Sequence, residues 1–201
     1  RYCEAYQPEF IPNLSSCKSP QQMTGAMLKT YWAEKNGIDP KDIVSVSVMP
    51  CTAKKFEIGR DDQAAAGVAD VDISITTREL ARLIKRLGIT FNTLPDEEFG
   101  SPLGSGTGAA VIFGATGGVM EAALRTANDV LTGKDNKEIE FTAVRGTEGL
   151  KEATYNIAGM DIKVCVASGA ANAKKVMDKI AKGEADWTFV EIMGCPGGCV
   201  N

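Results

Sequence analysis

The feature that most constrains the fold of this chain is the alternation of strand-like and helix-like segments along its 201 residues. Residues 43–49 alternate apolar and polar side chains with the period of two that is typical of a strand. Residues 80–87 repeat leucine and isoleucine at spacings of three and four, which is typical of an amphipathic helix. Strands that alternate with helices are typical of α/β proteins with parallel sheets. The sequence therefore predicts an α/β fold.

The expected elements follow from these two periods. We expect strands at residues 43–49, 139–144, 162–167 and 187–193, helices at 19–37, 76–88, 116–131 and 170–182, and loops at 58–69 and 92–108. Capping boxes are predicted to begin the first two helices, formed by Ser19 with Gln22 and by Thr76 with Glu79. The predicted inner face of the first helix consists of Met23, Ala26, Met27, Thr30 and Tyr31, and that of the third of Met120, Leu124, Ala127 and Leu131.

The chain contains no histidine, and this absence excludes several kinds of site. Nucleophiles activated by histidine, zinc or haem bound by histidine, and imidazole acid–base catalysis are all ruled out. Any metal must be held by cysteine or carboxylate. The net charge of −4 argues against a nucleic-acid surface, which would be basic. No apolar run approaches the roughly 18 residues of a membrane span.

Cysteines follow two of the predicted strands in the same way. Met49-Pro50-Cys51 ends the first strand and Met193-Gly194-Cys195 ends the last. Ligands of α/β proteins bind outside the carboxyl ends of strands. Gly197 and Gly198 allow a tight turn between Cys195 and Cys199. Thiolates without histidine favour an iron–sulfur cluster or a four-cysteine zinc site. The remaining cysteines, Cys3, Cys17 and Cys165, are interpreted as small buried apolar residues in a reduced protein.

The glycine-rich residues 100–118 partly match the pattern of a nucleotide-binding loop. Gly104, Gly106 and Ala109 match the loose dinucleotide pattern, and Asp129 lies twenty residues further on. However, no predicted strand precedes these glycines, and Asp129 falls inside a predicted helix. Because the pattern needs a strand, a turn and a helix in that order, its context argues against a nucleotide site.

Four segments of the chain resemble motifs of the iron-only (FeFe) hydrogenases, in the order that this family has them. These segments are Asn13-Leu14-Ser15-Ser16-Cys17-Lys18-Ser19-Pro20-Gln21-Gln22-Met23, Met49-Pro50-Cys51-Thr52-Ala53-Lys54-Lys55-Phe56-Glu57, Ile112-Phe113-Gly114-Ala115-Thr116-Gly117-Gly118-Val119-Met120-Glu121-Ala122-Ala123 and Glu191-Ile192-Met193-Gly194-Cys195-Pro196-Gly197-Gly198-Cys199. The resemblance spans the whole chain, so residues 1–201 are interpreted as part of a hydrogenase catalytic domain.

This resemblance implies a fold, an activity and a set of partners. The expected domain has two α/β lobes, each a mostly parallel sheet flanked by helices, with the cofactor in the cleft between them. The expected enzyme reversibly converts protons and electrons to dihydrogen at an H-cluster. That cofactor is a 4Fe-4S cubane bridged by a cysteine to a di-iron unit with carbonyl, cyanide and dithiolate ligands. The expected partners are dihydrogen and protons as substrates, ferredoxin or another redox protein, and hydrogenase maturation proteins, with no nucleic acid and no membrane span.

The resemblance also implies roles for individual residues. The expected cubane ligands are Cys51, Cys195 and Cys199, and Cys199 bridges to the di-iron unit. The groups expected around the cyanides and the distal iron are Ser19, Pro20, Gln21 and Lys54. Apolar packing around the di-iron unit is expected from Met49, Phe113 and Met193. Ser15 matches a hydroxyl on the proton path, and the catalytic set is therefore Ser15, Lys54 and Cys199.

Two family motifs are missing from these residues. The signature Thr-Ser-Cys-Cys-Pro-x-Trp supplies the fourth cubane ligand and the cysteine that passes protons to the di-iron unit, and Gly-Gly-Gly-Gln-Pro usually follows the last cysteine. In addition, Gly194 replaces a more usual alanine. We therefore expect the 201 residues alone not to evolve hydrogen at an enzymatic rate.

The sequence leaves two other classes of protein to compare with the enzyme. A hydrogenase-like iron–sulfur protein in cluster assembly would need the cubane cysteines but not the residues around the di-iron unit, and hydrogen sensing with low turnover is a further alternative. A structural four-cysteine zinc domain has compact ligand spacing, which the long separation of Cys51 and Cys195 does not match. The joint presence of Met49, Lys54, Phe113 and Met193 favours the enzyme.

Overall fold

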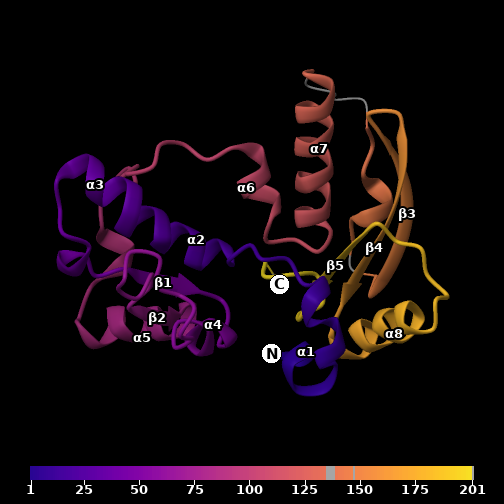
Figure 1. Cartoon of the computed structure of the whole chain (residues 1–201). Coiled ribbons are helices and arrows are strands. Elements are labelled where there is room, and N and C mark those ends of the chain that lie inside the picture. Colours follow the sequence, from indigo (N-terminus) through magenta and orange to yellow (C-terminus); the bar gives the residue numbers. More distant parts are fainter. Residues whose placement is uncertain (135–138, 147, 201) are drawn as a thin grey trace. The chain divides into compact units, whose positions relative to one another are not determined.

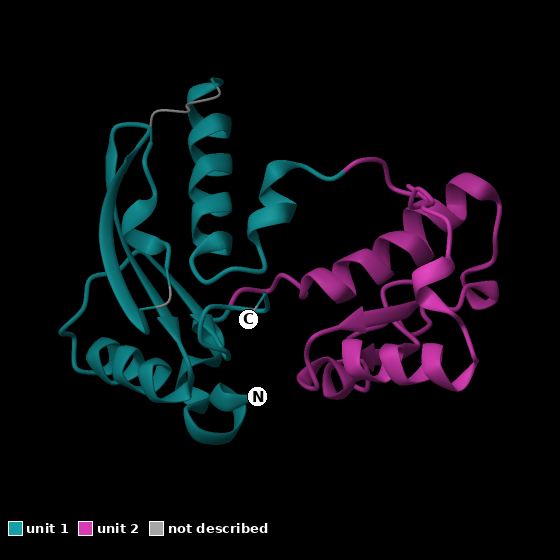
Figure 2. Cartoon of the chain, turned by 180° about the vertical axis from the view of Figure 1, so that it is seen from behind, with its two compact units in different colours: residues 1–14, 106–201 teal, residues 15–105 magenta. Residues whose placement is uncertain are grey.

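The computed structural model describes residues 1–134, 139–146 and 148–200 (Figure 1). The chain divides into two compact units, which are described separately here (Figure 2). Unit 1 consists of residues 1–14 and 106–201, and unit 2 of residues 15–105. Each unit contains a small β-sheet with helices, so the predicted α/β class is confirmed. In the described part of the chain, no helix is long and apolar enough to cross a membrane.

The helices and strands have the following bounds. Unit 2 contains α2 (Pro20–Met27), α3 (Ala33–Asn36), α4 (Ala53–Glu57), α5 (Thr77–Arg86), β1 (Val46–Met49) and β2 (Ile73–Thr76), with η2 (Leu28–Trp32) as a π-helical turn between α2 and α3 and the 3-10 turns η3 (Pro40–Asp42) and η4 (Phe91–Thr93). Unit 1 contains α1 (Tyr2–Tyr6), α6 (Gly108–Ile112), α7 (Gly118–Thr132), α8 (Ala170–Ala181), β3 (Leu150–Ile157), β4 (Met160–Ser168) and β5 (Phe189–Met193), with the 3-10 turns η1 (Pro8–Asn13) and η5 (Thr142–Val144).

The sheet of unit 2 has two parallel strands, β1 and β2, paired from Val46 with Ile73 to Met49 with Thr76. The capping box predicted for α5 is confirmed, because the Glu79 N–H donates to the Thr76 hydroxyl and the Thr76 N–H donates to the Glu79 carboxylate. The box predicted for α2 is only half formed. Ser19 Oγ accepts a hydrogen bond from the backbone N–H of Gln22 at 3.4 Å. The side-chain amide of Gln22 is buried but has no hydrogen-bond partner among the described residues, so it does not complete the box.

The inner face predicted for the first helix is wrong. Met23, Met27 and Tyr31 are 39%, 44% and 51% exposed. The buried residues of this helical segment are Gln21, Gln22, Gly25, Lys29 and Ala33.

Polar contacts explain why this face turns inward. A Cβ atom on Gly25 would lie 2.3 Å from the backbone oxygen of Asp70, so only glycine allows this approach. The buried Lys29 ammonium donates to the Asp72 carboxylate at 2.6 Å and to the backbone oxygen of Ala69 at 2.7 Å. The helix therefore packs through an ion pair and a close backbone contact rather than through its apolar residues.

The sheet of unit 1 is mixed. Its order is β3-β4-β5, with β3 and β4 antiparallel and β4 and β5 parallel. The antiparallel pair is closed by a two-residue turn in which Ala158 and Gly159 have φ values of 52° and 84°, as a tight hairpin requires. The expectation of mostly parallel strands therefore describes the sheet of unit 2 and one of the two pairings in unit 1.

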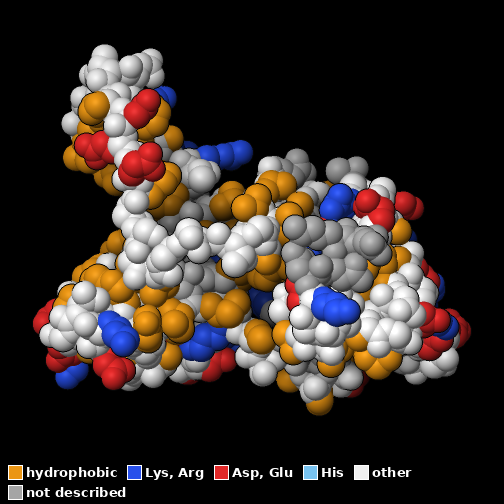
Figure 3. Space-filling model, turned by 90° about the horizontal axis from the view of Figure 1, so that it is seen from above, with side chains coloured by type: hydrophobic (Ala, Val, Ile, Leu, Met, Phe, Trp, Pro, Cys, Tyr) orange, Lys and Arg blue, Asp and Glu red, His pale blue; other side chains and the backbone are white. Residues whose placement is uncertain are grey.

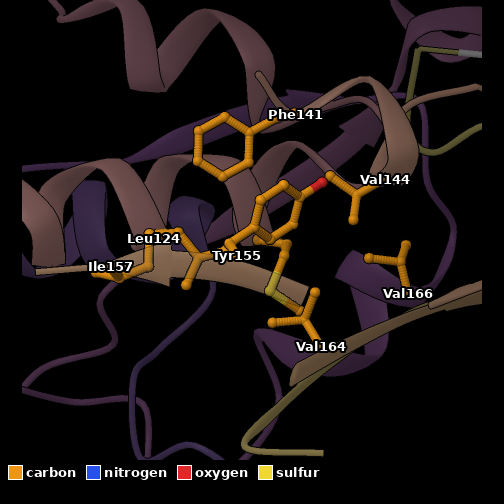
Figure 4. Packing of buried hydrophobic residues seen from close by; sticks show 8 residues of the cluster. Leu124, Phe141, Val144, Tyr155, Ile157, Val164 and Val166 are labelled. Carbon is orange, nitrogen blue, oxygen red and sulfur yellow. The ribbon is translucent and has the colours of Figure 1, made fainter. Parts of the chain in front are cut away.

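The core of unit 1 lies between α7 and this sheet (Figure 4). The Phe141 and Tyr155 rings are 4.7 Å apart between centroids, and the Arg125 guanidinium lies 4.6 Å from the Phe141 ring centroid. The buried members of this core are Met120, Leu124, Phe141, Val144, Tyr155, Ile157, Val164 and Val166. Met120 and Leu124 confirm part of the predicted inner face of this helix, whereas Leu131 is 59% exposed.

One predicted strand is wrong and one strand was not predicted. Residues 139–144 form no strand where they are described, and Thr142–Val144 form a 3-10 turn that buries Phe141 and Val144 against the sheet. The strand β3 was missed because charged side chains interrupt its alternation. One of these, Lys151, is buried, since its ammonium donates to the Gly146 backbone oxygen at 2.7 Å.

Candidate functional site

In unit 2, three predicted site residues meet on one carboxylate. Glu57 Oε2 accepts hydrogen bonds from Ser19 Oγ at 2.8 Å, from Lys54 Nζ at 3.0 Å and from Gln21 Nε2 at 3.1 Å. Lys54 and Glu57 are both about four-fifths buried at their side chains, so their attraction is screened less than that of an exposed pair. The side chains of α2 and α4 are thereby held together at a single ion pair.

Gln21 connects this ion pair to the sheet. Its amide oxygen accepts from Ser47 Oγ of β1 at 2.6 Å and from Ser74 Oγ of β2 at 3.4 Å. Its amide nitrogen also donates to the Lys54 backbone oxygen at 3.4 Å. Because both ends of the amide are engaged, the buried Gln21 side chain has a fixed orientation between the strands and α4.

Cys51 lies in the turn between β1 and α4, at the carboxyl end of its strand as predicted. Met49 is the last residue of β1, and both Met49 and Cys51 are half-buried. Lys54 follows on the first turn of α4. The predicted Pro20 is exposed at the start of α2. The predicted Ser15 is also exposed, and its hydroxyl accepts the Cys17 N–H at 3.2 Å.

In unit 1, Cys195 and Cys199 lie in the turn that follows β5. The Cys199 N–H donates to the Gly114 oxygen at 2.6 Å, and the Thr116 N–H donates to the Gly197 oxygen at 3.1 Å. The Cys195–Cys199 turn is thus bonded to the glycine-rich segment that precedes α7. Gly198 has a φ of 96°, and a Cβ there would lie 2.3 Å from the Gly114 oxygen, so this contact requires glycine.

A buried carboxylate fixes the strand that leads to these cysteines. Glu191, on β5, accepts the backbone N–H groups of Gly117 and Met120 at 2.7 Å each. These are unbonded donors of the first turn of α7, where the helix dipole also favours a negative charge. The predicted Met193 and Phe113 are half-buried at the end of β5 and directly after α6. Unit 1 therefore holds two of the three predicted ligand cysteines and two of the three predicted apolar site residues.

The cysteines outside these turns differ in burial. Cys3 and Cys165 are buried as predicted, and burial raises the pKa of the Cys165 thiol to about 11. The interpretation of Cys17 as a buried residue is wrong, because it lies exposed in the extended segment before α2. All six cysteines are free thiols. Over residues 1–134, 139–146 and 148–200, no three side chains of Cys, Asp or Glu gather as a ready metal site.

The complete chain, residues 1–201, matches the family model described as "Iron only hydrogenase large subunit, C-terminal domain". This chain belongs to the iron-only hydrogenase family. It is 51% identical over 200 residues to the periplasmic [Fe] hydrogenase large subunit of Nitratidesulfovibrio vulgaris, with 100% of this chain and 48% of that protein covered. It is 48% identical to iron hydrogenase 1 of Clostridium pasteurianum, of which it covers 35%.

The chain is also similar to an iron–sulfur assembly protein and to solved hydrogenases. The chain is 31% identical over 207 residues to the cytosolic iron-sulfur assembly component 3 of Mus musculus, covering 43% of it. A solved structure of a variant of the [FeFe]-hydrogenase HydA1 from Chlamydomonas reinhardtii matches 97% of this chain with a TM-score of 0.78 and 42% identity. The match covers 56% of that solved chain, so this hydrogenase-family chain spans about half the length of its relatives or less.

Sequence reasoning did not select three residues that the structure places in these sites. Glu57 follows Lys54 at the spacing of three that brings helical side chains together, which was an available signal. Glu191 was signalled by its place in the fourth family-like segment and by its charge inside an apolar strand. Thr116 lies in the third of these segments, but no residue pattern around it indicates that its hydroxyl is buried without a partner.

Proposed function

We propose that this chain is part of the catalytic domain of an iron-only hydrogenase, which reversibly oxidises dihydrogen and reduces protons at an H-cluster. The observation that carries the proposal is the meeting of Ser19, Gln21 and Lys54 on Glu57. Lys54 lies three residues after Cys51, which follows the end of β1. A buried lysine held in this way presents a fixed cationic donor next to a soft metal ligand. Such a donor suits the anionic ligands of an H-cluster.

The donors of this chain fit an H-cluster chemically. Cys51, Cys195 and Cys199 are free thiols, two of them exposed, in a chain without histidine. The Thr116 hydroxyl is buried beside the Cys195–Cys199 turn and has no hydrogen-bond partner in the described part of the chain. A buried hydroxyl without a partner costs about 1–3 kcal/mol, which an acceptor on a bound cluster would relieve.

We assign the residues as follows. Cys51, Cys195 and Cys199 would hold the cubane, and Cys199 would also ligate the di-iron unit. A cubane takes four ligands, so the fourth comes from polypeptide beyond these residues. When bound, the cofactor supplies the redox chemistry and the metal site at which dihydrogen reacts.

The other side chains position groups around the cofactor. Lys54 donates to anionic ligands of the di-iron unit, and Glu57 keeps Lys54 in place. Ser19, Pro20 and Gln21 would lie around the same ligands, and Ser15 would carry protons. Met49, Phe113 and Met193 exclude water. The proposed electron partner is ferredoxin or another redox protein, and maturation proteins deliver the di-iron unit.

A second candidate function is iron–sulfur cluster assembly, or hydrogen sensing, by a hydrogenase-like protein. The 31% identity to the mouse assembly component supports it. The 51% identity to the Nitratidesulfovibrio vulgaris hydrogenase and the Lys54–Glu57 pair favour the enzyme. Assembly requires no di-iron unit, so carbonyl and cyanide infrared bands distinguish it from the other two roles. Turnover then distinguishes catalysis from sensing.

The test replaces Lys54 by Met in the complete, matured enzyme, with Lys55→Met as the matched control. Lys55 is adjacent and also carries an ion pair, but its partner is Glu79. Lys54→Met should retain the cubane signal in electron paramagnetic resonance, lose the infrared bands of the di-iron unit and lose hydrogen turnover. Lys55→Met should keep all three. Full turnover in Lys54→Met, or a matured wild type without infrared bands, would contradict the proposal.

The cysteine assignment has its own test. Replacing Cys3, Cys17 and Cys165 together by Ser should leave the cubane signal of the reconstituted protein intact, whereas Cys195→Ser should abolish it. The 201 residues alone, supplied with a di-iron mimic, should evolve hydrogen far more slowly than the complete enzyme, because ligation and exposure set cluster stability and potential. Comparable rates would show that the ligands are assigned wrongly.

A further inference from the structure

Two buried charges of opposite sign face the same side of the sheet of unit 1. In the register of this sheet, Lys151 of β3 pairs with Val166 of β4, and Val166 pairs with Glu191 of β5. Residues that are directly opposite each other on neighbouring strands point to the same face of the sheet. Val166 belongs to the core under α7 (Figure 4), so the Lys151 and Glu191 side chains also lie on the face that α7 covers.

Burial distinguishes this pair from the surface charges of the molecule. Figure 3 shows lysine and arginine side chains at the surface, with acidic side chains near them. Lys151 and Glu191 are each only 6% exposed. Among the described residues of unit 1, the other buried charged side chain is Glu121, which pairs with Arg125 and Arg145. Burial lowers the pKa of the Lys151 ammonium, and attraction to Glu191 opposes this shift.

Glu191 closes a ring of contacts around the Cys195–Cys199 turn. From Glu191 the chain leads through the end of β5 into this turn, and the Cys199 N–H donates to the Gly114 oxygen at 2.6 Å. From Gly114 the chain continues to Gly117, whose N–H donates to Glu191 Oε1 at 2.7 Å. The second carboxylate oxygen accepts another N–H from the first turn of α7. The Glu191 carboxylate therefore connects the segment that supports the turn to the strand that leads into it.

Lys151 reaches the same part of unit 1 from β3. Its ammonium donates to the Gly146 oxygen at 2.7 Å. Gly146 lies two residues after Val144, and the backbone oxygen of Val144 lies against Gly117, where a Cβ atom would be only 2.0 Å from it. Gly117 is thus in contact with the segment that Lys151 holds and is bonded to the Glu191 carboxylate.

We propose that Glu191 is a positioning residue of the Cys195–Cys199 turn, and that Glu191 and Lys151 shift the reduction potential of the cubane in opposite directions. Their burial matters because buried charges are screened less than exposed ones. An electron that enters the cubane adds a negative charge, which the Glu191 carboxylate disfavours and the Lys151 ammonium favours. The effect on the potential rests on the proposed function, whereas the positioning of the turn does not.

The first experiment measures the midpoint potential of the cubane by electron paramagnetic resonance in the complete polypeptide, reconstituted with iron and sulfide. Glu191→Gln should shift the potential to more positive values, and Lys151→Met should shift it to more negative values. Lys151→Arg keeps the charge and should retain the wild-type potential. The matched controls Glu152→Gln and Lys163→Met make the same charge changes at exposed positions of β3 and β4, so they should shift the potential less.

Opposite shifts in the two variants are the result that a merely structural role would not give. If both substitutions only loosened the fold, they would expose the cubane to water and move its potential in the same direction. Shifts of the same sign, or shifts no larger than those of the controls, would therefore overturn the effect on the potential. A wild type without a cubane signal would contradict the proposed function and this effect with it, and the second experiment would still decide the positioning role.

The second experiment measures amide hydrogen exchange at Gly117 and Met120 in the complete polypeptide without metal. Glu191→Gln removes the charge and one of the two acceptor oxygens, so these amides should exchange at least about tenfold faster. Glu191→Asp keeps the charge on a shorter side chain. It should also speed exchange but leave the cubane potential near that of the wild type, and it serves as the test if Glu191→Gln does not fold. Glu152→Gln should leave exchange at both amides unchanged. Wild-type exchange in both Glu191 variants would overturn the positioning role.

Discussion

Units 1 and 2 have opposite interiors. Unit 1 is organised around fully buried apolar side chains such as Met120, Phe141 and Val166. The fully buried side chains of unit 2 include Gln22, Lys29 and Asp70, which carry polar or charged groups. Burial of apolar area stabilises unit 1 without demanding particular bond geometries. Unit 2 depends on hydrogen bonds and ion pairs, which stabilise only when each group meets its partner.

The polar interior of unit 2 is continuous with its candidate site. Gln21 belongs both to the contacts between α2 and the sheet and to the group of donors on Glu57. The same bonds that hold the unit together therefore orient Lys54. In unit 1 the site is a glycine-rich turn attached to an apolar body, and Glu191 is the main polar group that orients it. A substitution among the polar contacts of unit 2 should therefore change both its stability and the geometry of its site. In unit 1, a substitution in the apolar core should lower stability with less effect on the cysteine turn.

The two tryptophans allow this comparison to be measured. Trp187 lies in unit 1 and Trp32 in unit 2, and the chain has no others. Variants with Trp32→Phe or Trp187→Phe report the urea unfolding of one unit at a time.

The largest effect is expected from Phe141→Ala in unit 1. The substitution removes a fully buried ring that stacks on Tyr155 and lies under the Arg125 guanidinium, and such changes cost about 3–5 kcal/mol. Trp187 fluorescence should show this loss while the transition of Trp32 stays in place. Phe99→Ala is the control, because Phe99 is 98% exposed. A loss of the same size reported by Trp32 would mean that the two interiors are not independent.

A smaller effect is expected from Lys29→Met in unit 2. Removing one partner of a buried pair costs about 3–5 kcal/mol, and the partial exposure of Asp72 reduces this to roughly 2–3 kcal/mol. Trp32 fluorescence in the Trp187→Phe background measures the change. Lys41→Met, at an exposed lysine, should change little. If Lys29→Met were neutral or stabilising, the polar interior of unit 2 would not be what holds α2 in place.

The contrast between the units also explains which parts of the structure were predictable. Apolar periodicity located α8, which packs through apolar side chains such as Val176 and Met177. It also located β1 and β5, and so placed Cys51 and Cys195 at strand ends, because the alternation of a strand persists even where its apolar face is exposed. It failed for α2, where Gly25 and Lys29 select the inner face through contacts with residues about forty-five positions away.

Two further failures have the same cause. Strand β3 was missed because the charged Lys151 interrupts its alternation, although its ammonium is buried and donates to the backbone oxygen of Gly146 just before the strand. Glu57 and Glu191 were not selected, because their roles consist of bonds to side chains and backbone groups elsewhere in the fold. The spacing of apolar residues in the sequence predicts which apolar side chains are buried. It gives no information about polar side chains that are buried together with a hydrogen-bond or ion-pair partner.

The smallest effect is expected from acid at the start of α5. Hydrogen bonds from Lys55 and from the Thr76 backbone lower the pKa of Glu79 to about 2, from its ordinary 4.5. Because the folded pKa lies below the unfolded one, the stabilisation is complete above about pH 4.5 and is lost as the pH falls toward 2. Glu79→Gln should therefore lower the urea midpoint of unit 2 slightly at pH 6, and the gap to the wild type should close by pH 2.

The measurement follows Trp32 in the Trp187→Phe background at several pH values, with Glu34→Gln as the control at an exposed glutamate on α3. Asp72 also has a lowered pKa, because Lys29 and the Ser45 N–H bond to its carboxylate, so the acid sensitivity that remains in Glu79→Gln should be reduced further by Asp72→Asn. If the gap between wild type and Glu79→Gln stayed constant from pH 6 to pH 2, the capping box would act through shape rather than charge. Stabilisation of unit 2 by charged groups would then come from its buried pairs and not from the Glu79 carboxylate at the start of α5.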